Sequence, residues 1–156
     1  MAECKNIMVY VETAEGNPVK VGLEMLSPAK KLADKVTAVV IGGGVADAAK
    51  EVAKAGADQV ICVDSEDYKE FNLDAYAQVL VELVKEENPE AVFVGGTQDG
   101  KDIAPVVAAK CNTGCASDVL DIKAEDGEVI YTCPLYGGTV LEDVKIKTTP
   151  QIATLR

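Results

Sequence analysis

Four short apolar runs, spaced along the first two thirds of the chain, restrict its fold more than any other feature. They span residues 6–11, 36–41, 59–63 and 91–94, and their apolar residues follow no helical period. Runs of this length without polar alternation are typical of strands that are buried on both faces of a parallel sheet, because helical crossovers cover both faces. We therefore expect four fully buried, parallel strands.

Helical patterns separate these runs. Apolar residues recur at helical spacing in two intervals, as Val45, Ala48, Ala49, Val52 and Ala53, and as Leu73, Tyr76, Ala77, Leu80, Val81 and Val84. An earlier helix is expected over residues 21–34, kinked at Pro28, which has no backbone N–H. The helix that follows residue 45 should end at Ala55-Gly56, where glycine can take the left-handed conformation. This alternation predicts a doubly wound α/β fold, with helices on both faces of a mainly parallel sheet.

The pattern changes after Cys111. Residues 119–124, 129–133 and 140–147 have the pattern of strands, and Asp126-Gly127 is typical of a hairpin turn. Residues 151–155 are expected to add a short last strand. A chain of 156 residues has the size of one domain. We predict a single domain over residues 1–156, with a β-rich carboxyl-terminal extension.

Charge and hydropathy exclude several partners. Asp and Glu number 26 against 15 Lys and Arg, so the net charge is -11. This charge repels nucleic-acid phosphates and anionic membrane surfaces alike. No apolar run approaches the ~20 residues that span a bilayer, and the first residues lack the pattern of a signal peptide. We expect a cytoplasmic protein that neither binds nucleic acid nor inserts into a membrane.

Cysteine and histidine usage limit the chemistry. The five Cys, at positions 4, 62, 111, 115 and 133, form no paired framework and are expected to be free thiols. The chain has no His, which excludes Ser-His and Cys-His nucleophilic catalysis. Zinc needs four ligands, so Cys111 and Cys115 are predicted to be small core residues at the end of a helix. We expect no catalytic residue and no metal site.

Two predicted loops that follow strands are rich in glycine. In open parallel sheets, ligands bind beyond the carboxyl ends of the strands, where such loops lie. The first loop, residues 41–45, has the Gly42-x-Gly44 of a dinucleotide fingerprint but Asp47 at the position of the third glycine. That carboxylate would repel phosphate, so a tight strand-to-helix turn is favoured.

The second loop supplies the candidate site. Its residues are Gly95, Gly96, Thr97, Gln98, Gly100 and Lys101. They come within one residue of the phosphate-binding pattern G-x-x-x-x-G-K-[ST], but Asp102 replaces the hydroxyl that would bind magnesium, which disfavours NTP hydrolysis. Asp102 is instead expected to cap a helix that has Pro105 in its first turn. Binding of an adenine nucleotide by the loop remains an alternative.

Several segments together resemble the α subunit of electron-transfer flavoproteins. Residues 92–97, followed by Gly100-Lys101-Asp102-Ile103-Ala104-Pro105 and an Ala-rich helix, are similar to a family segment of glycine, arginine, aspartate, leucine, alanine and proline. Lys101 replaces the usual arginine. Ser117-Asp118-Val119 is similar to a second family segment, and residues 134–138, 144–147 and 150–154 are similar to a third. With residues 57–60 also similar, the resemblance covers essentially the whole chain.

The resemblance implies an adenine-nucleotide-hydrolase-like fold and a role as an electron-carrier component. In the family a second domain binds FAD, and its glycine- and arginine-rich segment has no counterpart here. We therefore expect FAD in the full-length subunit and none bound by this chain alone. The implied partners are an electron-transfer flavoprotein β subunit and, through the full complex, dehydrogenases. The β subunit holds AMP in the loop after its fourth strand, so the loop from Gly95 to Lys101 is by analogy a vestigial nucleotide loop.

A different class of function is a stand-alone adenine-nucleotide-binding module of the universal-stress-protein kind, which shares the parallel α/β architecture. Those proteins have two glycines separated by two residues and then, after nine intervening residues, a glycine and a hydroxyl residue. Gly95, Gly96 and Gly100 provide no such pair. The spacing counts against this alternative without excluding it.

Overall fold

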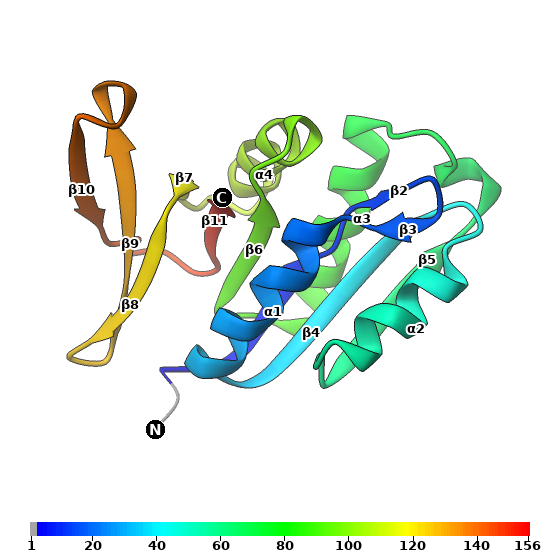
Figure 1. Cartoon of the computed structure of the whole chain (residues 1–156), viewed down its shortest axis with the longest axis horizontal. Helices are drawn as coiled ribbons and strands as arrows, with labels where there is room; N and C mark the ends of the chain where they lie inside the picture. Colours follow the sequence, from blue (N-terminus) through cyan, green and yellow to red (C-terminus); the bar gives the residue numbers. More distant parts are fainter. Residues whose placement is uncertain (1–2) are drawn as a thin grey trace.

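The computed structural model describes residues 3–156, and in them six strands form one parallel sheet (Figure 1). The strands are β1 (Cys4–Tyr10), β4 (Ala33–Gly42), β5 (Gln59–Asp64), β6 (Ala91–Gly95), β7 (Cys115–Val119) and β11 (Gln151–Leu155). Their order is β5-β4-β1-β6-β11-β7, and every neighbouring pair is parallel. The predicted parallel sheet is confirmed.

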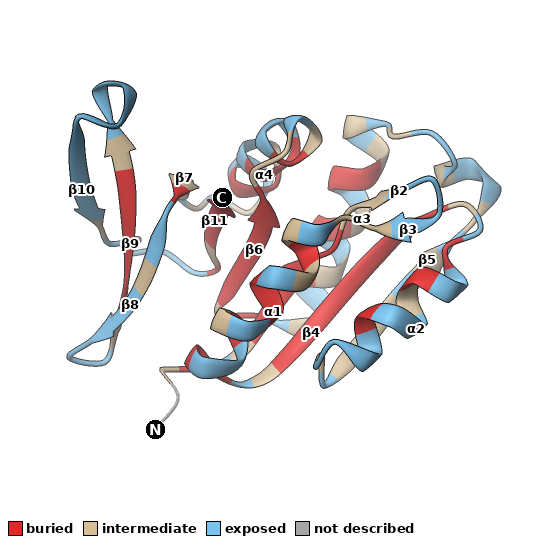
Figure 2. Ribbon diagram, in the orientation of Figure 1, coloured by how far each residue is buried: buried red, intermediate tan, exposed pale blue. Residues whose placement is uncertain are grey.

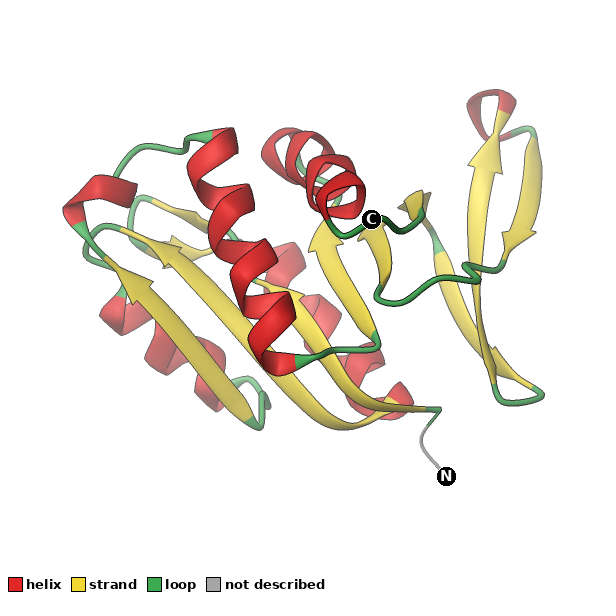
Figure 3. Ribbon diagram, turned by 180° about the vertical axis from the view of Figure 1, so that it is seen from behind, coloured by secondary structure: helices red, strands yellow, loops and turns green. Residues whose placement is uncertain are grey.

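Four helices cover the two faces of this sheet. On one face, α1 (Lys20–Leu32) and α2 (Ala46–Lys54) bury Leu26, Ala29 and Val52 against it. On the other, α3 (Leu73–Glu87) and α4 (Gln98–Lys110) bury Leu80 and Ile103. Figure 3, seen from behind, shows α3 in front of the strands. The sheet lies between two apolar cores, which confirms the doubly wound arrangement.

Strand β5 differs from the expectation of a fully buried strand. None of its six residues is fully buried, and Cys62 and Asp64 are exposed. The reason is its place at the edge of the sheet, where β4 is its one neighbour. An apolar run shows that a strand is suited to burial but does not give its position in the strand order.

Helix α1 runs through Pro28, as predicted, but ends at Leu32. Ala33 already has extended backbone angles and pairs with Cys4, so β4 begins three residues before the predicted start. The Asp58 carboxylate then accepts hydrogen bonds from the Val36 N–H at 2.7 Å and from Lys30 Nζ at 2.6 Å. This contact ties α1 to the start of β4.

A second, antiparallel sheet protrudes beside β7 (Figure 1). It contains β8 (Asp121–Glu125), β9 (Glu128–Leu135) and β10 (Val140–Val144), in the order β10-β9-β8. The Asp126-Gly127 turn is confirmed, and both residues have positive φ, 52° and 78°. The predicted single strand over residues 119–124 was wrong, because the chain leaves the parallel sheet after Val119 and enters the antiparallel sheet at Asp121.

Two short elements complete the fold near the carboxyl end of β1. Strands β2 (Thr13–Ala14) and β3 (Asn17–Pro18) form a small hairpin, and a 3-10 turn, η1 (Glu66–Tyr68), follows β5. Another 3-10 turn, η2 (Tyr136–Gly138), joins β9 to β10. Strand β1 lies between β4 and β6, so the strand order reverses beside it. The carboxyl ends of β1 and β6 therefore form the edge where a ligand is expected in this architecture.

Candidate functional site

The loop after β6 is capped by Thr97. Its hydroxyl accepts a hydrogen bond from the Gly100 N–H at 3.0 Å, and α4 begins at Gln98. The prediction that Asp102 caps this helix was wrong: Asp102 lies within the helix, where its carboxylate meets the Gln98 side chain at 3.5 Å. Pro105 likewise lies in the interior of α4 rather than in its first turn. Thr97 can cap the helix because Gly100, whose N–H donates to it, has no side chain and packs directly against the end of β6.

The glycines of this loop are needed for close packing. A Cβ atom on Gly95 would lie 2.6 Å from Val21 of α1, and one on Gly96 would lie 3.0 Å from the carbonyl oxygen of Leu155. At Gly100 the corresponding distance to the carbonyl oxygen of Gly95 is 1.9 Å. All three values are shorter than ordinary van der Waals contacts. Contacts within the chain therefore account for the glycine content of the loop.

The Thr97 hydroxyl also connects the ends of β6 and β1. It donates a hydrogen bond to the Glu12 carboxylate at 2.5 Å. Burial raises the pKa of Glu12, and the nearby Asp99 carboxylate raises it further, while the hydrogen bond from Thr97 acts in the opposite direction. Two carboxylates thus lie beside the amino terminus of α4, where a phosphate would otherwise be favoured.

Lys101 points to a different group of residues. Its ammonium lies 3.9 Å from the Asp118 carboxylate, which also receives two hydrogen bonds from the Arg156 guanidinium. The bonds from Arg156 hold the pKa of Asp118 below its usual range. Of the predicted site residues, Thr97 contacts Glu12, Gln98 contacts Asp102, and Lys101 lies with Asp118. These three side chains therefore make separate contacts within the protein.

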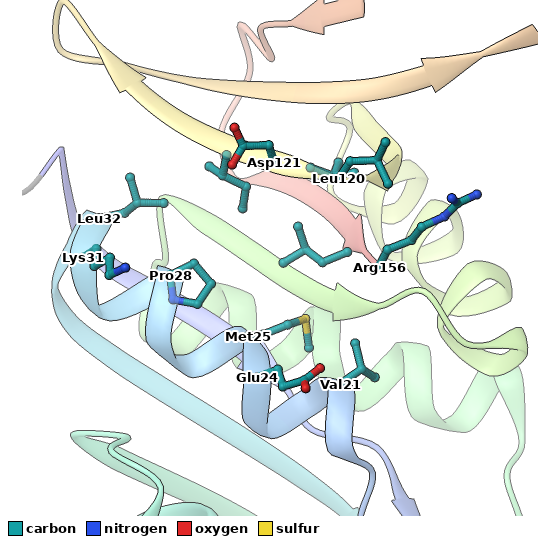
Figure 4. A pocket seen from close by; sticks show the side chains of 12 residues that line it. Val21, Glu24, Met25, Pro28, Lys31, Leu32, Leu120, Asp121 and Arg156 are labelled. Carbon is teal, nitrogen blue, oxygen red and sulfur yellow. The ribbon is translucent and has the colours of Figure 1, made fainter. Parts of the chain in front are cut away.

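Two hollows lie near the carboxyl ends of the strands. The first, here called the β1–β4 cavity, has a volume of about 470 Å³ and is lined by residues of β1, β4, the β2–β3 hairpin, the segment after η1, α3 and α4. The second, called the α1 groove, has a volume of about 330 Å³. Figure 4 shows Met25 and Pro28 of α1 on one side of this groove, with Leu120 and Arg156 across from them.

Sequence reasoning missed the residues that line the β1–β4 cavity. Tyr10 is the last residue of β1 and Glu12 follows it by two positions, and both line the cavity. A tyrosine followed two residues later by a carboxylate, at the end of an apolar strand, was the available signal. Asp99 comes from the first turn of α4 and could be placed with them only once the strand order was known.

Comparison with known proteins identifies the family. The family model described as the electron transfer flavoprotein domain matches residues 7–156. The chain belongs to the electron-transfer flavoprotein family. It is 36% identical to Protein FixB of Clostridium saccharobutylicum, over 100% of this chain and 48% of that protein. It is also 36% identical to the electron transfer flavoprotein subunit alpha of Clostridium acetobutylicum (99% of this chain, 48% of the relative) and 38% identical to that of Syntrophomonas wolfei (95% and 47%).

The chain spans about half the length of the curated relatives it matches, and the matched part is their amino-terminal part. This confirms the resemblance to electron-transfer flavoprotein α subunits, which are electron carriers. No helix among residues 3–156 has the length and apolar character to cross a membrane.

The β1–β4 cavity and the α1 groove do not fit FAD, the cofactor that the family implies. FAD carries a pyrophosphate, which the carboxylates of the β1–β4 cavity would repel. The α1 groove presents Glu24 and Asp121 against Lys31 and Arg156, and Arg156 is already bonded to Asp118. Neither hollow offers the surplus of free donors that a pyrophosphate needs.

Proposed function

We propose that this chain is the scaffold and β-subunit-docking domain of an electron-transfer flavoprotein α subunit. The observation that carries the proposal is the family match over residues 7–156, with relatives about twice as long as this chain. The full-length subunit passes electrons from dehydrogenases by way of FAD, which is held by residues outside this chain. The protein acts in the cytoplasm.

The residues of this chain bind a partner and hold a fixed shape, and none of them is catalytic. The two apolar cores of the parallel sheet provide rigidity, while bound FAD supplies the electron transfer of the whole complex. The pair of Asp118 and Arg156 fixes the chain direction at the end of β11. The domain thereby offers a stable base on which other domains of the complex rest.

The tip of the β9–β10 hairpin supports the docking role. Of the five large apolar residues that are exposed among residues 3–156, four lie there: Leu135, Tyr136, Val140 and Leu141. Tyr136 is 84% exposed. Figure 2 shows β9 buried along most of its length and the tip beyond it exposed. Apolar side chains gathered on one protruding surface are typical of a protein interface. With a net charge of -11, a second copy of this chain is a poor occupant.

Co-expression with the β subunit from the same genome tests the proposal. A tagged copy of residues 1–156 is purified, and the complex is examined by size-exclusion chromatography with light scattering. We expect a heterodimer to which this chain contributes no flavin absorbance. The docking role is wrong if neither the folded chain nor the full-length α subunit binds the β subunit. Tight binding of AMP or ATP by the isolated chain, measured by calorimetry, would instead favour a nucleotide-binding module.

A further inference from the structure

The β1–β4 cavity is lined by a tyrosine that is buried as a residue, Tyr10. Tyr10 is 2% exposed, and its hydroxyl forms no hydrogen bond within residues 3–156. Every fully enclosed side-chain nitrogen or oxygen in this part of the chain does have a partner. The Tyr10 hydroxyl must therefore reach the cavity that its side chain lines. A hydroxyl that opens into a cavity can form a hydrogen bond with a polar ligand atom there, and because the ring of Tyr10 is buried, the position of this hydroxyl is fixed.

The charges around the same cavity are mostly negative. Glu12, Glu15, Glu70 and Asp99 line it, and none of the four forms an ion pair within the described residues. The basic residue in the lining, Lys69, lies 3.9 Å from Glu66, outside the cavity. Four carboxylates around one cavity produce a negative potential that attracts cations and repels phosphates.

The walls of the cavity are held in place by aromatic contacts. Tyr76 donates a hydrogen bond to the Tyr68 carbonyl oxygen at 2.5 Å, and its ring meets the Phe71 ring edge-on with centroids 5.0 Å apart. Phe71 and Tyr76 both line the cavity. Their faces can contact the hydrocarbon part of a ligand or a cationic group.

Volume and donor chemistry then indicate the kind of ligand. About 470 Å³ is within the range of sites for small organic molecules. Among residues 3–156, no three acidic groups are arranged as ligands of a metal ion. From the Tyr10 hydroxyl, the unpaired carboxylates and the aromatic wall, we propose that the β1–β4 cavity binds a small organic cation, an amine or guanidinium on a short carbon chain.

In this complex the cationic N–H groups donate to the Glu12 and Asp99 carboxylates and to the Tyr10 oxygen. The carbon chain lies along Phe71 and Tyr76. The site is separate from the hairpin tip that docks the β subunit, so either assignment can fail without the other.

Isothermal titration calorimetry at low ionic strength, with agmatine as the probe, tests this proposal on residues 1–156 or on the heterodimer. Agmatine carries an amine and a guanidinium on a four-carbon chain. We expect saturable binding of agmatine and none of AMP. Tyr10→Phe keeps the ring and removes the hydroxyl, and it should weaken binding by about fivefold. Asp99→Asn, at a half-buried position, should weaken it by about tenfold or more. The matched control Glu86→Gln removes the same charge from an exposed position of α3 and should bind as the parent protein does.

The proposal would be overturned if millimolar agmatine gave no heat of binding. It would also be overturned if Asp99→Asn bound agmatine as tightly as the parent protein does, or if Glu86→Gln lost as much affinity as Asp99→Asn. Competition of AMP or adenosine for the same site would assign the cavity to a nucleoside, and displacement of agmatine by equimolar calcium chloride would assign it to a metal ion. If Tyr10→Phe is too unstable to measure, the comparison of Asp99→Asn with Glu86→Gln decides.

Discussion

The guanidinium of Arg156 holds the carboxylate of Asp118 through two hydrogen bonds, Nε to Oδ1 at 2.9 Å and Nη2 to Oδ2 at 2.8 Å. Asp118 has a φ of 62°, in the left-handed region, and its N–H donates to Thr154 Oγ1 at 2.8 Å. The Arg156 N–H donates in turn to the Val119 carbonyl oxygen. These bonds join the irregular end of β7 to the end of β11, where the pairing of the two strands shifts register.

Two substitutions at Asp118 separate its charge from its backbone conformation. Asp118→Asn removes the ion pair but keeps a residue that tolerates the left-handed conformation, so the free energy of unfolding should fall by at most about 1 kcal/mol. Asp118→Ala loses both the ion pair and the tolerance of the left-handed conformation, so its free energy of unfolding should be lower by about 1 kcal/mol more. Urea denaturation measures both values. Equal losses in the two variants would show that the backbone conformation contributes nothing.

Gly100 should tolerate a methyl group far less well than Gly114. A Cβ at Gly100 would lie 1.9 Å from the Gly95 carbonyl oxygen, a backbone atom, whereas a Cβ at Gly114 would lie 3.4 Å from the Ile146 side chain. We expect Gly100→Ala to lower the free energy of unfolding by more than about 2 kcal/mol and Gly114→Ala to change it by about 0.5 kcal/mol or less. Thermal unfolding followed by circular dichroism gives the comparison. Unchanged stability of Gly100→Ala would show that packing does not require this glycine.

The local pattern of the sequence was enough to predict the layered fold. Four apolar runs and the helical stripes between them correspond to β1, β4, β5, β6 and the helices that connect them. What the pattern could not give was the strand order. Strand β5 lies at an edge, and β11, the last strand in sequence, lies between β6 and β7. Such positions depend on contacts between distant segments, which a local pattern does not contain.

The same limit applies to the candidate site. The loop from Gly95 to Lys101 is glycine-rich because of contacts with Val21 and Leu155, residues far away in sequence, and a search for phosphate motifs does not consider such contacts. Thr97 was predicted as a site residue, but its partner Glu12 is 85 positions away. Leu120 ends one strand pattern and precedes another without a turn residue, so the break between β7 and β8 left no local signal.

Glu12 should make the protein less stable as the pH rises. Burial, with Asp99 nearby, raises the pKa of Glu12 above its ordinary value of 4.5. Between the unfolded and folded pKa values the folded state binds more protons, so stability decreases with increasing pH in that interval. The penalty is complete above the folded pKa and absent below the unfolded one.

Glu12→Gln removes this titration and keeps an oxygen that accepts the bond from Thr97. The variant should therefore have a higher midpoint of thermal unfolding than the parent protein at pH 8. This gap, the difference between the two midpoints, should close as the pH falls below 4.5. Scanning calorimetry across this range measures the gap. Glu86→Gln, at an exposed position of α3, should show no such trend. A gap that widens toward low pH would contradict the assignment.

The hairpin tip should matter for association and not for stability. Tyr136 and Leu141 are 84% and 60% exposed, so replacement of either by Ser should change the free energy of unfolding by about 0.5 kcal/mol or less. If Tyr136 is an anchor of the β-subunit interface, Tyr136→Ser should weaken binding by about thirtyfold, in the range of interface hot spots. Leu120→Ser is the matched control, since Leu120 is a large, exposed apolar residue of the α1 groove. Surface plasmon resonance with immobilised β subunit compares the three variants. Loss of binding in Leu120→Ser, with Tyr136→Ser unaffected, would move the docking surface from the hairpin tip to the groove beside α1.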